Sequence, residues 1–143
     1  MTIHQISVFL ENRAGQLAEI TSVLARHNID LRAINIAETT DYGVLRLIAD
    51  KPQEAASVLL EQGFILSMTP VLAVSVPDEP GGLARVLEVL ARENIDVEYM
   101  YSVFGQVDGR AHMNFRVADV ETLDAVLRAS GIVPAEAGDL GVQ

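Results

Sequence analysis

The chain contains a long internal repeat, and this feature limits the folds open to it more than any other. Residues 12–30 read NRAGQLAEITSVLARHNID, and residues 78–96 read DEPGGLARVLEVLARENID. Ten of these 19 positions are identical at a fixed offset of 66 residues. Such self-similarity indicates that one supersecondary unit has been duplicated. The sequence therefore predicts two related domains, residues 1–69 and residues 70–143.

Each copy shows the pattern of a strand, a helix, two strands, a second helix and a last strand. In the first copy, apolar residues recur at helical spacing from Leu17 to Leu24, and Pro52 suits the first turn of a second helix. The intervening β-rich segments are bounded by turn signals. The expected strands are residues 3–9, 29–37, 44–49 and 64–68, then 71–76, 97–104, 111–117 and an edge strand near Ile132.

This βαββαβ order predicts an α+β fold of the ferredoxin-like type, in which both helices of a copy cover one face of an antiparallel sheet. Almost no linker separates the copies, so we expect them to pack together. Residues 71–76 are apolar on both strand faces, which favours packing between the sheets of two chains, and hence a homodimer. The tail AEAGDLGVQ is expected to be loose.

Composition excludes several classes of function. The chain has 20 acidic and 10 basic residues and a net charge of −10, which argues against nucleic-acid binding. It has no Cys, so disulfides and thiolate chemistry are excluded. The start of the chain lacks the features of a signal peptide, and residues 64–76 are too short an apolar run to span a membrane. We expect a cytoplasmic protein that does not bind membranes.

Catalytic and metal-binding patterns are also missing. His4, His27 and His112 lack metal-ligand spacing, so no metal site is predicted. Four aromatic residues are compatible with a base-stacking sheet: Tyr99, Tyr101, Phe104 and Phe115. The basic residues of an RNA-binding sheet are absent, however, and core or interface packing explains the aromatic residues better. No nucleophile with a base and no phosphate loop stands out. The sequence therefore predicts neither an enzyme nor a bound cofactor.

The loops that join the first strand to the first helix of each copy could hold a ligand. They read NRAGQL from Asn12 and DEPGGL from Asp78. Glycine lets a backbone approach a ligand closely, and a helix N-terminus offers N–H groups to a carboxylate. Asn12 and Asp78 could accept hydrogen bonds from an ammonium group, so the loops suit an α-amino acid. The alternative is that these two residues cap the helices while the glycines ease a tight turn.

These loops, followed by Leu-Ala-Arg-x-Asn-Ile-Asp in both copies, resemble the ACT domain, a regulatory module found in serine-regulated phosphoglycerate dehydrogenases and aspartokinases. The resemblance implies two ACT units side by side, with an eight-stranded sheet, four helices on one face and an amino acid bound between the units. The ligand-binding residues that it implies are Asn12, Arg13, Ala14, Gly15, Gln16, Leu17 and Asp30 in the first copy, and Asp78, Glu79, Pro80, Gly81, Gly82, Leu83 and Asp96 in the second.

By the same resemblance, one pocket would join Asn12 and Gly15 to Asp96, and the other would join Asp78 and Gly81 to Asp30. Two carboxylates in the second pocket would favour an ammonium group or a cation and disfavour acidic amino acids. Serine-binding relatives carry a His two residues before the loop Asn. Leu10 and Val76 take that position here and make serine itself a doubtful ligand.

The function predicted in this way is that of a stand-alone tandem ACT protein, which binds an amino acid or similar small molecule and signals allosterically to a partner enzyme. Two alternatives remain open. One is a structural oligomerisation module without functional pockets. The other is a small enzyme on a ferredoxin-like scaffold, which would need a polar catalytic cluster.

Overall fold

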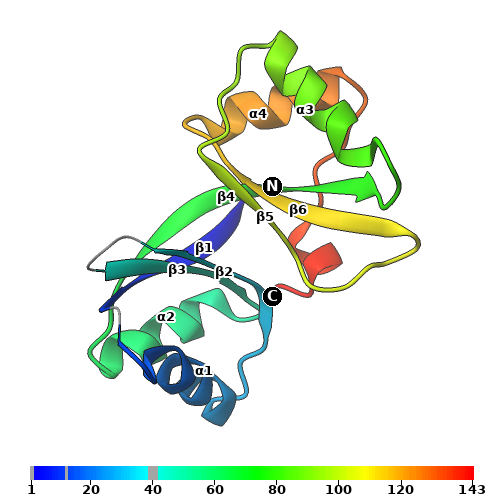
Figure 1. Cartoon of the computed structure of the whole chain (residues 1–143). Helices are drawn as coiled ribbons and strands as arrows, with labels where there is room; N and C mark the ends of the chain where they lie inside the picture. Colours follow the sequence, from blue (N-terminus) through cyan, green and yellow to red (C-terminus); the bar gives the residue numbers. More distant parts are fainter. Residues whose placement is uncertain (1, 12, 39–41) are drawn as a thin grey trace. The chain divides into compact units, whose positions relative to one another are not determined.

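The computed structural model describes residues 2–11, 13–38 and 42–143 (Figure 1). Its strands and helices follow the predicted order, except that two of the expected strands are not separate elements. They are β1 (Ile3–Glu11), α1 (Gln16–Arg26), β2 (Leu31–Glu38), β3 (Tyr42–Ala49), α2 (Pro52–Glu61), β4 (Ile65–Pro77), α3 (Gly82–Arg92), β5 (Tyr99–Ser102), β6 (Arg110–Arg116), α4 (Val120–Ala129) and the short 3₁₀ helix η1 (Ala137–Leu140).

The described strands number six, not the expected eight, and form one antiparallel sheet in the hydrogen-bonded order β2-β3-β1-β4-β6-β5. The last strand of the first copy and the first strand of the second copy are joined into one strand, β4, which runs through Pro70. The edge strand expected near Ile132 is replaced by an isolated bridge between Val74 and Pro134. The prediction of eight strands was therefore wrong, because turn signals at Thr69-Pro70 did not break the chain.

The chain divides into two compact units, with the division inside β4 between Thr69 and Pro70. The N-terminal unit consists of His4–Thr69 and Gly141–Gln143. The C-terminal unit consists of Pro70–Leu140 and the first residues of the chain up to Ile3. In the N-terminal unit β3 pairs with β1 and β2, and in the C-terminal unit β6 pairs with β4 and β5.

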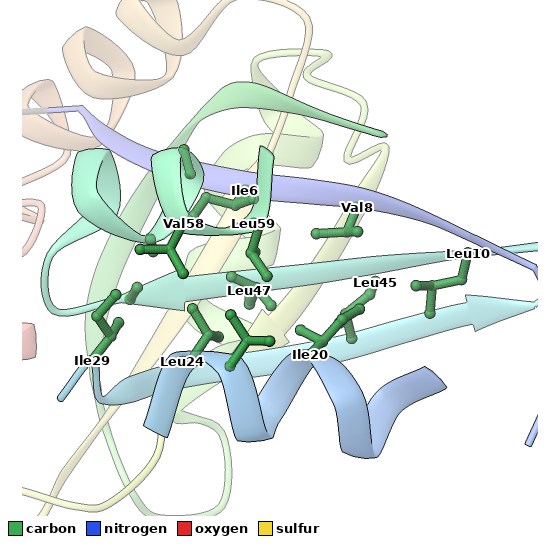
Figure 2. Packing of buried hydrophobic residues seen from close by; sticks show 14 residues of the cluster. Ile6, Val8, Leu10, Ile20, Leu24, Ile29, Leu45, Leu47, Val58 and Leu59 are labelled. Atoms are coloured by element: carbon green, nitrogen blue, oxygen red, sulfur yellow. The ribbon is translucent and has the colours of Figure 1, made fainter. Parts of the chain in front are cut away.

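The core of the N-terminal unit lies between its two helices and its strands (Figure 2). Helix α1 buries Ile20, Val23 and Leu24, whose spacing of three to four residues places them on one face. Alternate strand residues face these helices, because successive side chains of a strand point to opposite sides. The strand and α2 contributions include Ile6, Val8, Leu10, Leu45, Leu47, Ala55, Val58 and Leu59.

The C-terminal unit repeats this construction. Its helices α3 and α4 lie together on one side of β5 and β6 (Figure 1). Phe115 of β6 is fully buried at the centre, and Leu90 of α3 and Leu127 of α4 are among the buried leucines of the two helices. The remaining members of the cluster are Leu72, Val74, Val76, Val86, Val117, Val120 and Leu123.

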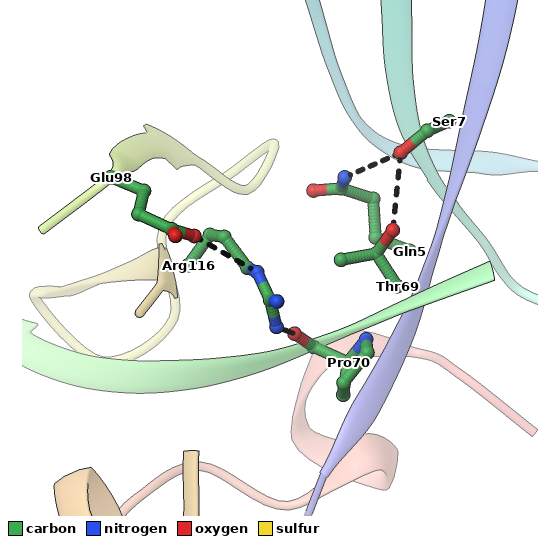
Figure 3. A network of polar contacts seen from close by, with 6 residues as sticks. All are labelled: Gln5, Ser7, Thr69, Pro70, Glu98 and Arg116. Carbon is green, nitrogen blue, oxygen red and sulfur yellow. Dashed lines mark hydrogen bonds and ion pairs between the residues drawn. The ribbon is translucent and has the colours of Figure 1, made fainter. Parts of the chain in front are cut away.

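Strand residues on the side away from these cores include polar groups that bond to one another (Figure 3). In the N-terminal unit the Gln5 amide donates to Ser7 Oγ at 2.9 Å, and Ser7 Oγ lies 3.4 Å from Thr69 Oγ1. In the C-terminal unit Arg116 donates to the carbonyl oxygen of Pro70 at 3.0 Å and pairs with Glu98 at 3.1 Å. The Arg116 bond satisfies one backbone acceptor at the proline in mid-strand.

The C-terminal tail is ordered, so the expectation of a loose tail was wrong. Ala135 and Leu140 are 4% and 2% exposed. The amide of Ala135 donates to the carbonyl of Ala73 at 2.8 Å, and the amide of Gln143 donates to the carbonyl of Asp50 at 2.7 Å. These bonds and two buried side chains offset the entropy cost of fixing the segment.

All four α-helices end in the same turn. After α1, Asn28 has φ of 56°, its amide bonds to Ala25 O, and the amide of Ile29 bonds to Leu24 O. This is the Schellman arrangement, in which a left-handed residue ends the helix and the next apolar residue folds back on it. Asn94 takes the same place after α3, and Gly63 and Gly131 do so after α2 and α4. The repeated Asn-Ile pairs are therefore explained by helix termination.

Adjacent leucines of α2 provide a matched test of the N-terminal core. Leu59 is 0% exposed and Leu60 is 56% exposed. We expect Leu59→Ala to lower the free energy of unfolding by about 2–5 kcal/mol, because it leaves a cavity. Leu60→Ala should change it by less than about 0.5 kcal/mol. Urea denaturation followed by circular dichroism measures both free energies of unfolding. If the two variants lost equal stability, the assignment of Leu59 to the core would be wrong.

The helix-ending turns make a second prediction. Asn28→Val and Asn94→Val should each lower the free energy of unfolding by about 1–2 kcal/mol, because a β-branched residue is strained at positive φ. Asn28→Gly and Asn94→Gly should leave stability within about 1 kcal/mol, since Gly adopts this conformation freely. The same denaturation experiment applies. If Gly were as damaging as Val, the Asn side chain would have a role other than fitting the turn.

Candidate functional site

The predicted loops adopt the same conformation in both copies. In the first, β1 ends at Glu11 and α1 begins at Gln16, with Gly15 as the N-cap at φ of 88°. In the second, β4 ends at Pro77 and α3 begins one residue after Gly81, the N-cap at φ of 87°. A side chain at either N-cap would be strained, so the glycines are required by the turn itself.

The first turns of α1 and α3 have no side-chain cap, unlike the first turn of α4. At α4, Asp119 accepts hydrogen bonds from the Thr122 hydroxyl at 2.8 Å and the Thr122 amide at 3.2 Å. These bonds lower the pKa of Asp119 below its usual value, because they favour the carboxylate. No carboxylate does this for α1 or α3 in the described chain, so the positive ends of these two helices carry no side-chain acceptor at the cap.

Asp78 does not cap α3, which removes the capping alternative for this residue. Its carboxylate accepts a hydrogen bond from the Gln106 amide at 2.6 Å, and its backbone N–H donates to Gly109 O at 2.9 Å. The side chain is thereby held toward the loop between β5 and β6. Asn12, its counterpart in the first copy, lies outside the described residues.

A pocket lies beside the first helix of each copy. The β4–α3 pocket has a volume of about 470 Å³, and the β1–α1 pocket has a volume of about 390 Å³. Each is formed by the end of the strand, the first turn of the helix and the segment that follows the second helix. The β4–α3 pocket is lined by Ser75, Val76, Pro77, Gly82, Arg85, Val86, Arg110, Gly131, Ile132 and Val133. The β1–α1 pocket is lined by Phe9, Leu10, Glu11, Arg13, Gln16, Glu19, Gln62, Gly63, Phe64 and Ile65.

Only some of the predicted ligand-binding residues line these pockets. Arg13 and Gln16 line the β1–α1 pocket, and Gly82 lines the β4–α3 pocket. Leu17 lines a smaller neighbouring hollow of about 100 Å³, and Leu83 packs against the core of the C-terminal unit. The remaining loop residues are exposed without lining either of the two pockets: Ala14, Gly15, Glu79, Pro80 and Gly81.

Asp30 and Asp96 lie beyond the other ends of the helices. An 11-residue helix is about 16 Å long, so within each unit these residues are distant from the loop. Asp30 accepts from Arg32 at 3.0 Å, and its amide donates to Asp50 Oδ1 at 2.9 Å. Asp96 is exposed. Neither lines the pocket of its own unit.

Among the predicted ligand-binding residues, Gln16 has a buried side-chain acceptor that no described residue satisfies. Its side chain lines the β1–α1 pocket and is only 8% exposed. Its amide oxygen Oε1 is buried with no hydrogen-bond partner among the described residues. A buried acceptor without a partner is costly, which suits a site that a hydrogen-bond donor completes.

Gly82 takes the corresponding position in the second copy. A Cβ atom there would collide with the carbonyl oxygen of Pro77. The first turn of α3 therefore lies against the end of β4 more closely than any larger residue would allow. Sequence reasoning gave this glycine a ligand-binding role, and the structure adds a packing reason for it.

Sequence reasoning missed the charged residues of the pocket walls. Glu19 and Arg85 occupy equivalent positions one turn into α1 and α3, at the offset of 66 residues that defines the repeat. Comparing the charges of repeat-equivalent positions could have found them. Arg110 comes from β6 and donates from Nε to Ser75 Oγ at 2.7 Å and from Nη2 to Ser75 O at 3.0 Å. Its place in the wall depends on strand register, which no local pattern gives.

The described residues include no group of three or more His, Asp or Glu that could hold a metal ion. His27, which lacks metal-ligand spacing, bonds through Nδ1 to Val23 O at 2.9 Å. The rings of Tyr99 and Tyr101 stack with centroids 6.4 Å apart. None of the helices in the described chain is long and apolar enough to cross a membrane.

Comparisons with known proteins agree with this architecture. The family model described as an ACT domain pair matches residues 1–132. The crystal structure of protein BT0572 from Bacteroides thetaiotaomicron is similar with a TM-score of 0.91 and 38% identity, over 99% of this chain and 96% of that one. A search of curated proteins found no match.

More distant solved structures share the fold. The ligand-free regulatory subunit of aspartate kinase from Thermus thermophilus has a TM-score of 0.64 at 19% identity, over 90% of each chain. The corresponding subunit from Thermus flavus has a TM-score of 0.58 at 20% identity, over 92% of each chain. With a family model that covers nearly the whole sequence, the chain belongs to the family of ACT domain pairs.

Proposed function

We propose that this ACT pair is a cytoplasmic regulatory protein that binds an amino acid or a similar small molecule and signals to a partner enzyme. The observation that carries the proposal is the duplicated pocket beside a helix N-terminus that no described side chain caps. Both pockets exceed 300 Å³, the lower end of the range typical of small-molecule sites. Membership of a regulatory family supports a sensing role over a catalytic one.

The β1–α1 pocket supplies both kinds of group that an α-amino acid needs. The first turn of α1 offers backbone N–H groups and a positive dipole end to a carboxylate. Gln16 Oε1 is a buried acceptor that an ammonium group could use, and Glu11 and Glu19 add negative charge on the same wall. Arg13 lies 3.4 Å from Glu11 and already offsets part of that charge.

Signalling requires that the ligand favour one conformation of the pair over another. Each pocket is bounded by the first turn of one helix and by the chain that leaves the second helix. A ligand that contacts both segments would stabilise their arrangement, and a partner enzyme or a second copy of the chain could bind that arrangement selectively. A homodimer remains part of the proposal.

The proposal is tested by the melting temperature of refolded, ligand-free protein with each common amino acid at millimolar concentration. A ligand at about 100 times its Kd should add about 2.7 kcal/mol, or several degrees for domains of this size. Gln16→Leu should abolish the shift at the β1–α1 pocket while leaving the ligand-free protein as stable or slightly more so, because it removes a buried polar atom. Gln53→Leu, on the exposed start of α2, is the control and should keep the shift.

Two results would contradict the proposal. If no amino acid of the panel raised the melting temperature, the result would favour a structural module that holds partners together without a ligand. If every amino acid that stabilises the unchanged protein gave the same shift in Gln16→Leu, Gln16 would be removed from the site. Because this variant should not lose stability, a lost shift cannot be attributed to unfolding.

A further inference from the structure

The two equivalent pockets carry opposite charge. At the position one turn into the helix, the β1–α1 pocket has Glu19 and the β4–α3 pocket has Arg85. At the strand end, Glu11 of the first pocket is replaced by Pro77 in the second. Duplication places these positions in the same geometry, so the difference lies in the side chains rather than in the backbone.

Strand register adds a second cation to the β4–α3 pocket. Arg110 lies opposite Pro77 in the pairing of β4 with β6. In the first copy, Tyr42 lies opposite Glu11 in the pairing of β1 with β3. Tyr42 and Arg110 are therefore equivalent, and the second copy has an arginine where the first has a neutral ring.

No carboxylate of the described chain neutralises these arginines inside the β4–α3 pocket. The residues that line it include no Asp or Glu, and neither Arg85 nor Arg110 forms an ion pair with another described residue. The bonds of Arg110 to Ser75 fix its position without cancelling its charge. Arg110 also borders a separate hollow whose wall includes Asp108 and Asp139. Arg85 lines the β4–α3 pocket and does not line that second hollow.

We infer that the β4–α3 pocket binds the carboxylate of an acidic ligand, and that the β1–α1 pocket does not. The ligand class is a small dicarboxylate, and it is an acidic amino acid if the proposed function holds. Arg85, Arg110 and the positive end of α3 all border one cavity, and Val86, Ile132 and Val133 supply its apolar wall. In a protein of net charge −10, a cationic pocket is set apart from its surroundings.

This inference differs from the expectation that the second loop would disfavour acidic amino acids. That expectation placed the carboxylates of Asp78 and Asp30 in the pocket, and Asp30 does not line the β4–α3 pocket. The Asp78 carboxylate is instead bonded to Gln106 and does not line the β4–α3 pocket. The charge that reaches this cavity comes from Arg85 and Arg110, which sequence reasoning did not place there.

The test compares isosteric ligands by calorimetric titration of the whole chain. L-aspartate and L-glutamate should bind at least about tenfold more tightly than L-asparagine and L-glutamine, and succinate should bind although it lacks an ammonium group. Arg85→Gln should weaken aspartate binding by about tenfold or more. Arg85→Lys should keep part of the affinity, because it keeps the charge and loses the planar fork. Arg92→Gln, at the last turn of α3, is the control and should bind like the unchanged protein.

The outcomes separate this inference from the proposed function. If neutral amino acids bind as well as acidic ones and Arg85→Gln changes nothing, the inference is wrong and the sensing role stands. If succinate binds through Arg85 but no amino acid does, the cationic pocket is confirmed and amino-acid sensing is wrong. If nothing binds, both fail. Circular dichroism of each variant shows that a lost affinity does not come from lost folding.

Discussion

Each unit of this protein depends on burying the apolar stripe of two helices against alternate residues of its strands. In the N-terminal unit Ile20 and Leu24 of α1 meet Leu45 and Leu47 of β3, and burial of each such side chain contributes about 1.5–3 kcal/mol. This packing fixes where the helices begin. The glycine turns before α1 and α3, and the pockets beside them, lie where they do because the helix stripe must face the sheet.

The sequence predicted the elements well because its signals there are local. Helical spacing, strand alternation and the glycine and proline turn signals all act within a few residues. The errors concern interactions between residues that are distant in the sequence. Whether strands join across Thr69-Pro70 depends on their neighbours, and the order of the tail depends on burial of Ala135 and Leu140 against distant chain. A turn signal is only a preference, and pairing with other strands can override it.

The candidate site shows the same difference between local signals, which the sequence reveals, and long-range contacts, which it does not. The repeat and its glycines indicated that both loops could bind a ligand. Of the predicted residues, Arg13, Gln16 and Gly82 line the two pockets. Arg110 could not be foreseen, because only the register of β6 against β4 brings it to the wall. Duplicated scaffolds therefore separate two questions. Backbone geometry is inherited by both copies, whereas the charge of each pocket is free to change, and one pair of sites can come to recognise two chemistries.

The assignment of the chain ends to the two units has a consequence for the history of the duplication. Ile3, 2% exposed, belongs to the C-terminal unit, and Gly141–Gln143 belong to the N-terminal unit. Cutting the gene between Thr69 and Pro70 would give two fragments, each lacking residues that complete its own unit. The boundary of the repeat therefore does not coincide with the boundary of the units. An exchange of one half for a related copy would also have to supply the matching chain end.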